Sequence, residues 1–237
     1  VTLPMLFDPR NGVTSLETAM EELCHRASAA VADGVALLVL SDRGVDARHA
    51  PIPSLLATAG VHHHLVREGN RTRCGLIIET GDAREAHHMA LLLGYGAGVV
   101  NPYLAIETIE ELICTGEVTD IDPPQGVQHY VMALTKGVLK VMSKMGISSL
   151  QGYRGAQIFE AIGLNKDFVD RYFTSTASRV GGIGIDTVAA EVQKRHQLAF
   201  PTRGDEDSEL DSGGEYQWRR DGEYHLFNPE TVFKLQH

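Results

Sequence analysis

Apolar runs of strand length alternate with amphipathic helical segments through the first half of the chain. The predicted strands are 5–7, 35–40, 74–79 and 98–100, and the predicted helices are 15–33, 54–68, 84–93 and 102–114. Because strands joined through a helix run parallel, this alternation predicts an α/β fold with a parallel sheet of about four βα units. Four units make half of a TIM-like barrel or most of a flavodoxin-like sheet, and periodicity alone does not choose between them.

The second half is expected to be helical and loop-rich. Residues 118–126 read as a connector, 127–145 as a long helix and 146–155 as a loop rich in Ser and Gly. A short helix is predicted at 156–162, a short amphipathic segment at 168–173, a glycine-rich turn within 179–185 and a final helix at 185–200. We therefore expect a βα core over 1–116, a continuation of the same domain over 117–203, and an acidic flexible segment over 204–237.

Residues 204–222 contain seven acidic residues and four glycines with few apolar side chains. Such a composition predicts a mobile surface segment or linker. The chain begins at Val1 without an initiator Met or a secretory pattern, and it stops at His237 without a closing cap. We therefore expect a fragment of a longer chain, in which 204–237 leads toward a missing domain.

The net charge of −10 comes from 31 acidic and 21 basic residues in 237. A surface this acidic disfavours binding to nucleic acid and docking on an anionic membrane. No apolar run approaches the roughly 20 residues that span a bilayer. The three cysteines, Cys24, Cys74 and Cys114, are odd in number and widely spaced, so neither a disulfide framework nor a zinc knuckle is indicated. Free cysteines favour the cytoplasm as the compartment.

Two histidine patterns suggest metal sites. In the run His62–His64, consecutive helical residues lie about 100° apart, so all three cannot face one ion. Packed or hydrogen-bonded histidines are the favoured interpretation. Glu85 and His88 have the Glu-x-x-His spacing of di-iron bundles, but no second copy accompanies them. A local role at the strand end around Glu79–Asp82, where α/β proteins place functional loops, is favoured.

The run Gly181–Gly184 precedes a predicted helix and could cradle a phosphate there. It lacks the Walker lysine and the dinucleotide-binding pattern, so a close packing contact is favoured. Lys136, Lys140 and Lys144 recur every four residues and share one helical face. That stripe is either a solvated face or a contact with a negatively charged neighbour.

Several strings occur in this order along the chain: Leu40–Gly44, Val61–Arg67, Glu79–Gly81 with Ala83–Glu85 and His87–His88, Gly94–Ala97, Asn101–Ala105, Lys140–Ser148, Tyr153–Ala161 and Ser178–Arg179. Together they resemble the central domain of the large chain of glutamate synthase, and the match covers nearly the whole sequence. A final string, Phe227–Glu230, resembles the start of that family's FMN-binding synthase domain.

The resemblance implies an enzyme that turns glutamine, 2-oxoglutarate and reductant into two glutamates. An amidotransferase domain releases ammonia, which passes through an internal tunnel to an FMN site; an iron–sulfur cluster belongs to the same chain, and some members have a reductase subunit. The family's nucleophile lies upstream and its flavin and cluster residues lie downstream. The resemblance therefore implies no catalytic, cofactor or metal residue in this chain. It also allows a plastid location where the parent carries a transit peptide.

The leading hypothesis is a noncatalytic domain that links the amidotransferase and synthase domains and helps wall the ammonia path. The alternative is an independent half-barrel enzyme that binds a phosphorylated ligand at Gly181–Gly184. The segment 140–160 is the predicted surface toward the synthase domain, because a long loop on a rigid scaffold is often a contact surface. Its candidate contact residues are Lys140, Ser143, Lys144, Arg154 and Glu160.

Overall fold

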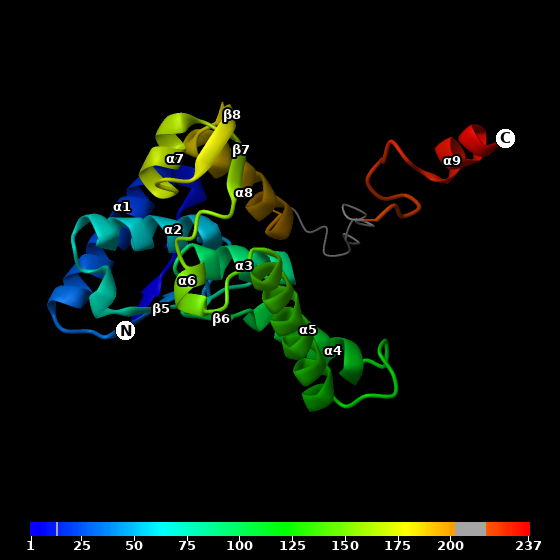
Figure 1. The fold of residues 1–237 in the computed structure, drawn as a ribbon, viewed down its shortest axis with the longest axis horizontal. Helices are drawn as coiled ribbons and strands as arrows, with labels where there is room; N and C mark the ends of the chain where they lie inside the picture. Colours follow the sequence, from blue (N-terminus) through cyan, green and yellow to red (C-terminus); the bar gives the residue numbers. More distant parts are fainter. Residues whose placement is uncertain (13, 202–216) are drawn as a thin grey trace. The chain divides into compact units, whose positions relative to one another are not determined.

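The computed structural model describes residues 1–12, 14–201 and 217–237. The chain forms two compact units, Val1–Phe200 and Pro201–His237 (Figure 1). Within the described residues, none of the helices is both long enough and apolar enough to cross a membrane.

The first unit is built on a four-stranded parallel sheet. Its strands are β1 (Thr2–Pro4), β3 (Leu37–Ser41), β5 (Gly75–Glu79) and β6 (Val99–Asn101), and they lie in that order. The spatial order is therefore the chain order, as the α/β prediction requires.

Each strand leads into a helix: α1 (Thr14–Ala32), α2 (Ser54–Arg67), α3 (Ala86–Gly94) and α4 (Tyr103–Cys114). Right-handed crossovers between strands that follow one another in space place their helices on the same face. A flavodoxin-like sheet instead reverses its strand order and puts helices on both faces. The arrangement is thus that of half a barrel, which settles the alternative left open by periodicity.

The hydrophobic core lies between the helices and one face of the sheet. Side chains at alternate strand positions point to opposite faces. On the helix-covered face the strand residues are fully buried, and the large side chains of α1 pack onto them. These core residues are Leu38, Leu40, Leu76 and Ile78 from the strands and Leu16, Met20 and Leu23 from α1.

The predicted strand 5–7 is present as Leu6–Phe7, but it does not belong to the parallel sheet. The strand of the main sheet is β1, whereas Leu6–Phe7 forms β2 and pairs antiparallel with β4 (Ala50–Pro51). Met5 is the crossing point: its amide donates to the Ser41 carbonyl, and its own carbonyl accepts from the Ile52 amide. An apolar run marks what is buried, not where the chain leaves a sheet.

The long helix α5 (Pro123–Lys144) starts four residues earlier than predicted. Asp122 caps it by accepting a hydrogen bond from the Gln125 amide at 2.8 Å, and Pro123 fits the first helical turn. The prolines that were read as part of a connector therefore begin the helix. A short helix, α6 (Leu150–Tyr153), lies within the predicted loop 146–155.

The predicted helix 156–162 and turn 179–185 are both wrong. Residues Glu160–Leu164 form β7 and Ala177–Ile183 form β8, a separate two-stranded parallel sheet connected by α7 (Lys166–Tyr172). The glycines permit this pairing: a Cβ on Gly182 would lie 2.3 Å from the Gly163 carbonyl oxygen. Close backbone approach, rather than turning, explains the glycine run.

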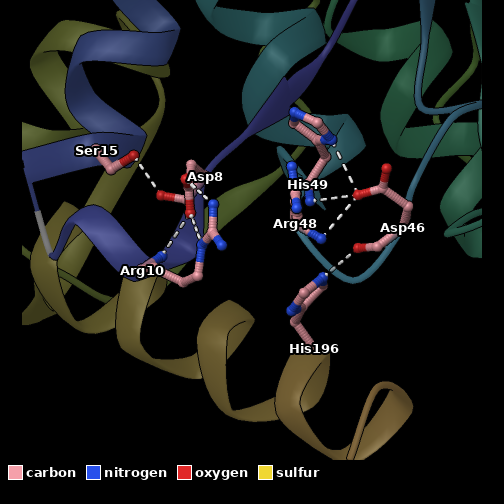
Figure 2. A network of polar contacts seen from close by, with 7 residues as sticks. All are labelled: Asp8, Arg10, Ser15, Asp46, Arg48, His49 and His196. Atoms are coloured by element: carbon pink, nitrogen blue, oxygen red, sulfur yellow. Dashed lines mark hydrogen bonds and ion pairs between the residues drawn. The ribbon is translucent and has the colours of Figure 1, made fainter. Parts of the chain in front are cut away.

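The helix α8 (Ile185–Ala199) packs against α1, the 3₁₀ helix η1 (Pro9–Asn11) and β4. Figure 2 shows polar contacts along this boundary. His196 Nε2 donates to the Asp46 carbonyl oxygen at 2.7 Å, and the Asp46 carboxylate accepts from the amides of Arg48 and His49, each at 2.8 Å. Asp8 accepts from the amide and side chain of Arg10 beside it. The His196–Asp46 bond connects α8 to the loop after β3, and the other bonds order that loop and η1 locally.

The second unit contains the helix α9 (Pro229–Gln236). Asn228 caps it by accepting a hydrogen bond from the Thr231 amide at 3.0 Å. The predicted mobile segment 204–222 falls, over 204–216, outside the described residues.

Candidate functional site

The carboxyl ends of three neighbouring strands bring polar residues into one row. In the strand register, Ser41 of β3 lies opposite Glu79 of β5, and Glu79 lies opposite Asn101 of β6. Strand registration alone therefore places their side chains on the same face. This edge of a parallel sheet is where barrel enzymes carry their functional groups.

Glu79 is the centre of this row. Its carboxylate accepts hydrogen bonds from Ser41 Oγ at 2.6 Å, Arg43 Nε at 2.9 Å and Asn101 Nδ2 at 3.3 Å. The Ser41 hydrogen bond, followed by those from Arg43 and Asn101, lowers the pKa of Glu79. Glu79 is therefore an ionised acceptor, the opposite of a general acid, which needs a raised pKa.

Asp42 forms a second, more deeply buried group. Its carboxylate accepts from Thr80 Oγ1 at 2.6 Å and from the Gly81 amide at 2.9 Å, and Asp42 and Thr80 are 2% and 0% exposed. Burial raises the pKa of Asp42, opposed by the hydrogen bonds of Thr80 and Gly81. The Thr80 hydroxyl also accepts from the Asp82 amide at 3.0 Å. One threonine thus joins two acidic residues of consecutive strand ends.

Arg43 closes the network toward α4. Its guanidinium lies 3.9 Å from the ring centroid of Tyr103 and donates to Glu107 at 3.1 Å. Burial, and then a hydrogen bond with Asp42, raises the pKa of the Tyr103 phenol. Arg43 thus joins the strand ends to α4 through a cation–π contact and two ion pairs.

The polar groups of this edge are satisfied mainly by one another. Such a network stiffens the strand ends, because each removal would leave a partner unpaired. It presents no activated nucleophile next to a base. The geometry at this edge is that of a structural joint.

The other face of the sheet is open. Leu37 and Val99, on outer positions of β3 and β6, are 56% and 54% exposed, whereas on the helix-covered face Leu38 is buried and Val100 partly buried. Parallel sheets are normally covered on both faces. Beside the edge strand β6, between α3 and α5, lies a groove of about 520 Å³ with an apolar wall. Its wall residues include Met89, Leu93, Val99, Leu134, Val138 and Met142.

The predicted contact residues fall into three places. Lys140, Ser143 and Lys144 are exposed in the last two turns of α5, and in the described part of the chain no carboxylate pairs with either lysine. Glu160 begins β7 and pairs with Arg179 at 3.5 Å. Arg154 is half-buried after α6. Lys140, Ser143 and Lys144 therefore form one exposed surface on α5, which we call the lysine surface, and Arg154 and Glu160 lie elsewhere.

The histidine run of α2 divides as expected for packed side chains. His64 Nε2 lies 2.8 Å from Ser28 Oγ, and His62 Nδ1 accepts from Arg71 Nε at 2.9 Å. Across the described ranges, no group of three or more His, Cys, Asp or Glu side chains is placed to hold a metal ion. His88 pairs locally with Glu85 at 3.3 Å and accepts from the Arg84 amide at 3.1 Å. Local contacts therefore hold His62, His64 and His88 in place.

The glycine run does not form a phosphate cradle. Gly181 and Gly182 belong to β8, and Gly184 precedes α8, where a Cβ would lie 2.7 Å from Asn165 Nδ2 and 2.9 Å from Asp186 Oδ1. A carboxylate in the first turn would repel a phosphate. Close packing explains the glycines at positions 182 and 184.

Sequence reasoning pointed to the segment Glu79–Asp82 but did not assign roles to Asp42, Arg43, Asn101 and Tyr103. One sequence feature could have identified them: each lies shortly after the end of a predicted strand. Nothing in their spacing along the chain shows that they meet, because the register of three strands brings them together.

Comparison with known proteins places this α/β half-barrel in a class of multidomain enzymes. The family model for the glutamate synthase central domain matches residues 1–165. The chain belongs to the glutamate synthase central domain family, which confirms the resemblance seen in its sequence.

Relatives with this domain are several times longer. The NADPH glutamate synthase large chain of Bacillus subtilis is 48% identical over 93% of this chain and 14% of its own length. The ferredoxin-dependent glutamate synthase 2 of Synechocystis is 42% identical over 95% of this chain and 15% of its own, and the NADH enzyme of Schizosaccharomyces pombe is 38% identical over 99% and 11%. The chain thus spans about a seventh of the Bacillus relative.

Among solved structures, the flavin-binding domain of baker's yeast flavocytochrome b2 aligns with 56% of this chain and 31% of its own. The TM-score is 0.43 at 20% identity.

Proposed function

We propose that the chain is the connecting domain of a glutamate synthase large chain. In this role it holds an amidotransferase domain and an FMN-binding synthase domain of the same parent chain in register. It also forms part of the wall of the path along which ammonia moves between them. The parent reaction converts glutamine, 2-oxoglutarate and reductant into two glutamates, and this chain contributes rigidity rather than reacting groups.

The main observation that supports this proposal is the open face of the sheet. A parallel sheet with more than half of the Leu37 and Val99 surfaces exposed is incomplete by itself. The relatives are several times longer than this domain. The synthase domain of the same parent is the occupant that we propose for this face and for the groove beside β6.

The described residues do not suit the parent's flavin or its iron–sulfur cluster. Cys24 and Cys74 are buried in different elements and Cys114 is exposed at the end of α4, whereas a cluster needs thiolates that converge. Of the two glycines of β8, Gly182 is packed against the backbone of Gly163 in β7. We therefore assign both groups to other parts of the parent and derive no step through them.

The lysine surface of α5 is the second part of the proposed contact. Lys140, Ser143 and Lys144 stand on the exposed side of the helix whose other side lines the apolar groove. A polar rim around an apolar patch is typical of protein interfaces. Glu160 and Arg154, the remaining contact candidates, lie beyond α6, and Glu160 is already paired within the domain.

Substitution of Val99 by Gln in the full-length parent enzyme tests the proposal. Glutamine hydrolysis alone and coupled glutamate formation are measured side by side. We expect coupled formation to fall about fivefold relative to hydrolysis, the effect of roughly 1 kcal/mol lost at the contact. In the 237-residue chain the same variant should melt at nearly the wild-type temperature, because Val99 is 54% exposed.

Leu198→Gln on α8 is the matched control, since it also changes a strongly exposed apolar side chain, 72% exposed. It should leave the ratio of the two rates unchanged. Equal loss of both rates in Val99→Gln, or a large drop in melting temperature of the 237-residue chain, would show that Val99 only stabilises the fold.

A further inference from the structure

Two adjoining cavities of about 210 and 240 Å³ lie beyond the carboxyl ends of β3 and β5, against α8. They share three wall residues, Pro53, Asp82 and Arg195, and we call the two cavities together the α8 cleft. Its other walls come from the loops after β3 and β5, the start of α2 and one side of α3. The carboxyl edge of a parallel sheet is where α/β proteins bind small molecules.

Opposite charges line this cleft without meeting. Arg84 and Arg195 contribute guanidiniums to its walls, and Asp82 contributes a carboxylate. In the part of the chain that the structure describes, none of these three side chains forms an ion pair. The Asp82 carboxylate accepts one hydrogen bond, at Oδ2 from the Ser54 amide. The gap between the opposite charges therefore suits a ligand that bridges them.

His196 adds a hydrogen-bond acceptor to the cleft. The residue is 8% exposed, and its Nε2 donates to the Asp46 carbonyl oxygen at 2.7 Å, as Figure 2 shows. In the neutral ring, that bond places the proton on Nε2 and leaves a lone pair on Nδ1. Nδ1 has no partner within the described ranges, yet it is not sealed from solvent, and His196 lines the cleft. An acceptor in such a wall is suited to a donor on a ligand.

The half of the cleft beside α8 has an apolar wall. It is formed by Val45, Val192, Ala199 and Phe200, and the Phe200 ring lies 4.9 Å from the His196 ring between centroids. Charged groups at one end and apolar side chains at the other suit a small molecule that has the same division.

We propose that the α8 cleft binds an α-amino acid with an apolar side chain. The carboxylate of the ligand pairs with Arg195, and Arg84 is the second cation. The ammonium group donates to Asp82 and to His196 Nδ1, and the apolar side chain lies against Phe200. Asp82 would repel a simple anion and the two arginines would repel a simple amine, so a molecule with both charges satisfies the whole set. This site does not depend on the role proposed for the chain in its parent.

Thermal melting of the 237-residue chain tests the site with L-leucine as the probe. Two half-ligands, 4-methylpentanoate and 3-methylbutylamine, keep the branched chain but carry only one charge each. All three are titrated at the same pH and ionic strength, so that screening is constant. We expect a saturable rise in melting temperature with leucine, because a ligand that binds only the folded state stabilises it.

Either half-ligand should need about a tenfold higher concentration for the same rise, since it lacks one charged contact. The absence of a saturable rise with leucine would overturn the proposal. An equal rise with one half-ligand at the same concentration would also overturn it, because the second charge would then have no partner in the cleft.

Arg195→Gln should weaken the apparent affinity for leucine about tenfold, since it removes a charged donor. Lys194→Gln is the matched control, a neighbouring exposed cation on α8 outside the cleft, and it should bind as the wild type does. Both side chains are exposed, so both variants should fold, which circular dichroism checks. Asp82→Asn keeps an acceptor for the Ser54 amide and should weaken binding by a similar factor. Unchanged affinity in Arg195→Gln or Asp82→Asn, or an equal loss in Lys194→Gln, contradicts the site.

Discussion

Thr80 Oγ1 donates to Asp42 Oδ2 at 2.6 Å across the ends of β5 and β3, and both residues are almost wholly buried. The same hydroxyl also accepts a hydrogen bond from the Asp82 amide. Asp82 in turn accepts from the Ser54 amide at the start of α2 with its Oδ2 at 3.0 Å. A chain of three hydrogen bonds therefore links two strand ends to the helix that follows β3.

Thr80→Val tests this link. The variant keeps the shape but removes the hydroxyl, so the Asp42 carboxylate and the Asp82 amide each lose a partner. We expect the free energy of unfolding to fall by about 1–3 kcal/mol, the usual effect of leaving buried polar groups unpaired. Urea unfolding at pH 7 measures it. Thr135→Val, on the exposed surface of α5, should change stability by less than about 0.5 kcal/mol, and a similar loss in both variants would contradict the link.

Glu79 predicts a pH dependence of stability. Because its pKa in the folded state is lowered by Ser41, Arg43 and Asn101, its contribution is fully present above its ordinary pKa of 4.5. That contribution is lost as the pH falls through the lowered folded value. Glu79→Gln should therefore reduce stability at pH 7 by about 1–2 kcal/mol and make the profile between pH 5 and 3 shallower.

Urea titrations at pH 3.5, 5 and 7 measure this profile. Glu110→Gln, an exposed glutamate on α4, should leave its shape nearly unchanged. Asp42 acts in the opposite sense: burial raises its folded pKa, so its effect destabilises the fold as the pH rises through that value. A Glu79→Gln profile as steep as that of the wild type would assign the acid sensitivity to other groups.

Whether a strand could be predicted from the sequence depended on how deeply its side chains are buried. The runs 35–40 and 74–79 bury one face under the helices, and their apolar patterns predicted strands that the structure confirms as β3 and β5. The strand β8 is exposed at every position and contains two glycines. It carries no apolar signal, and nothing in its composition separated it from a turn.

The hydrogen-bond network at the carboxyl ends of β3, β5 and β6 was not predicted, for a different reason. Ser41 and Glu79 are 38 residues apart, and only the parallel register of β3 and β5 brings them to 2.6 Å. The strand end at Glu79 drew attention as a place for function, but the identity of its partners is a property of the assembled sheet. Likewise, the spacing of Lys140 and Lys144 predicted a shared helical face, while the groove on the other side of α5 required the packing of α3 and β6.

The glycines of β8 make a matched pair for substitution. A Cβ on Gly182 would meet the Gly163 carbonyl oxygen at 2.3 Å, whereas a Cβ on Gly181 meets nothing within 4 Å. Gly182→Ala should therefore force β7 and β8 apart and lower stability by about 1–3 kcal/mol, while Gly181→Ala should be nearly neutral. Amide hydrogen exchange across β7 and β8 locates the change. Equal protection in both variants would mean that the close approach is not required.

The lysine surface of α5 gives the last prediction, which concerns the parent enzyme. Reversing the charge with the double variant Lys140→Glu and Lys144→Glu should weaken the contact proposed for the synthase domain. Coupled glutamate formation is expected to fall about fivefold relative to glutamine hydrolysis, and the loss should vary with salt because exposed charges are screened within about 8 Å at physiological ionic strength. The chemistry of hydrolysis belongs to another domain and should continue.

Lys194→Glu, an exposed lysine on α8, is the control and should leave the ratio of the two rates as it is. Melting of the 237-residue chain should be nearly the same for all of these variants, because the lysines make no ion pair with a described carboxylate whose loss could unfold it. If the double variant instead melts early and loses both rates together, the stripe acts only within this domain. If it keeps its melting temperature and both rates, the synthase domain does not rest on α5.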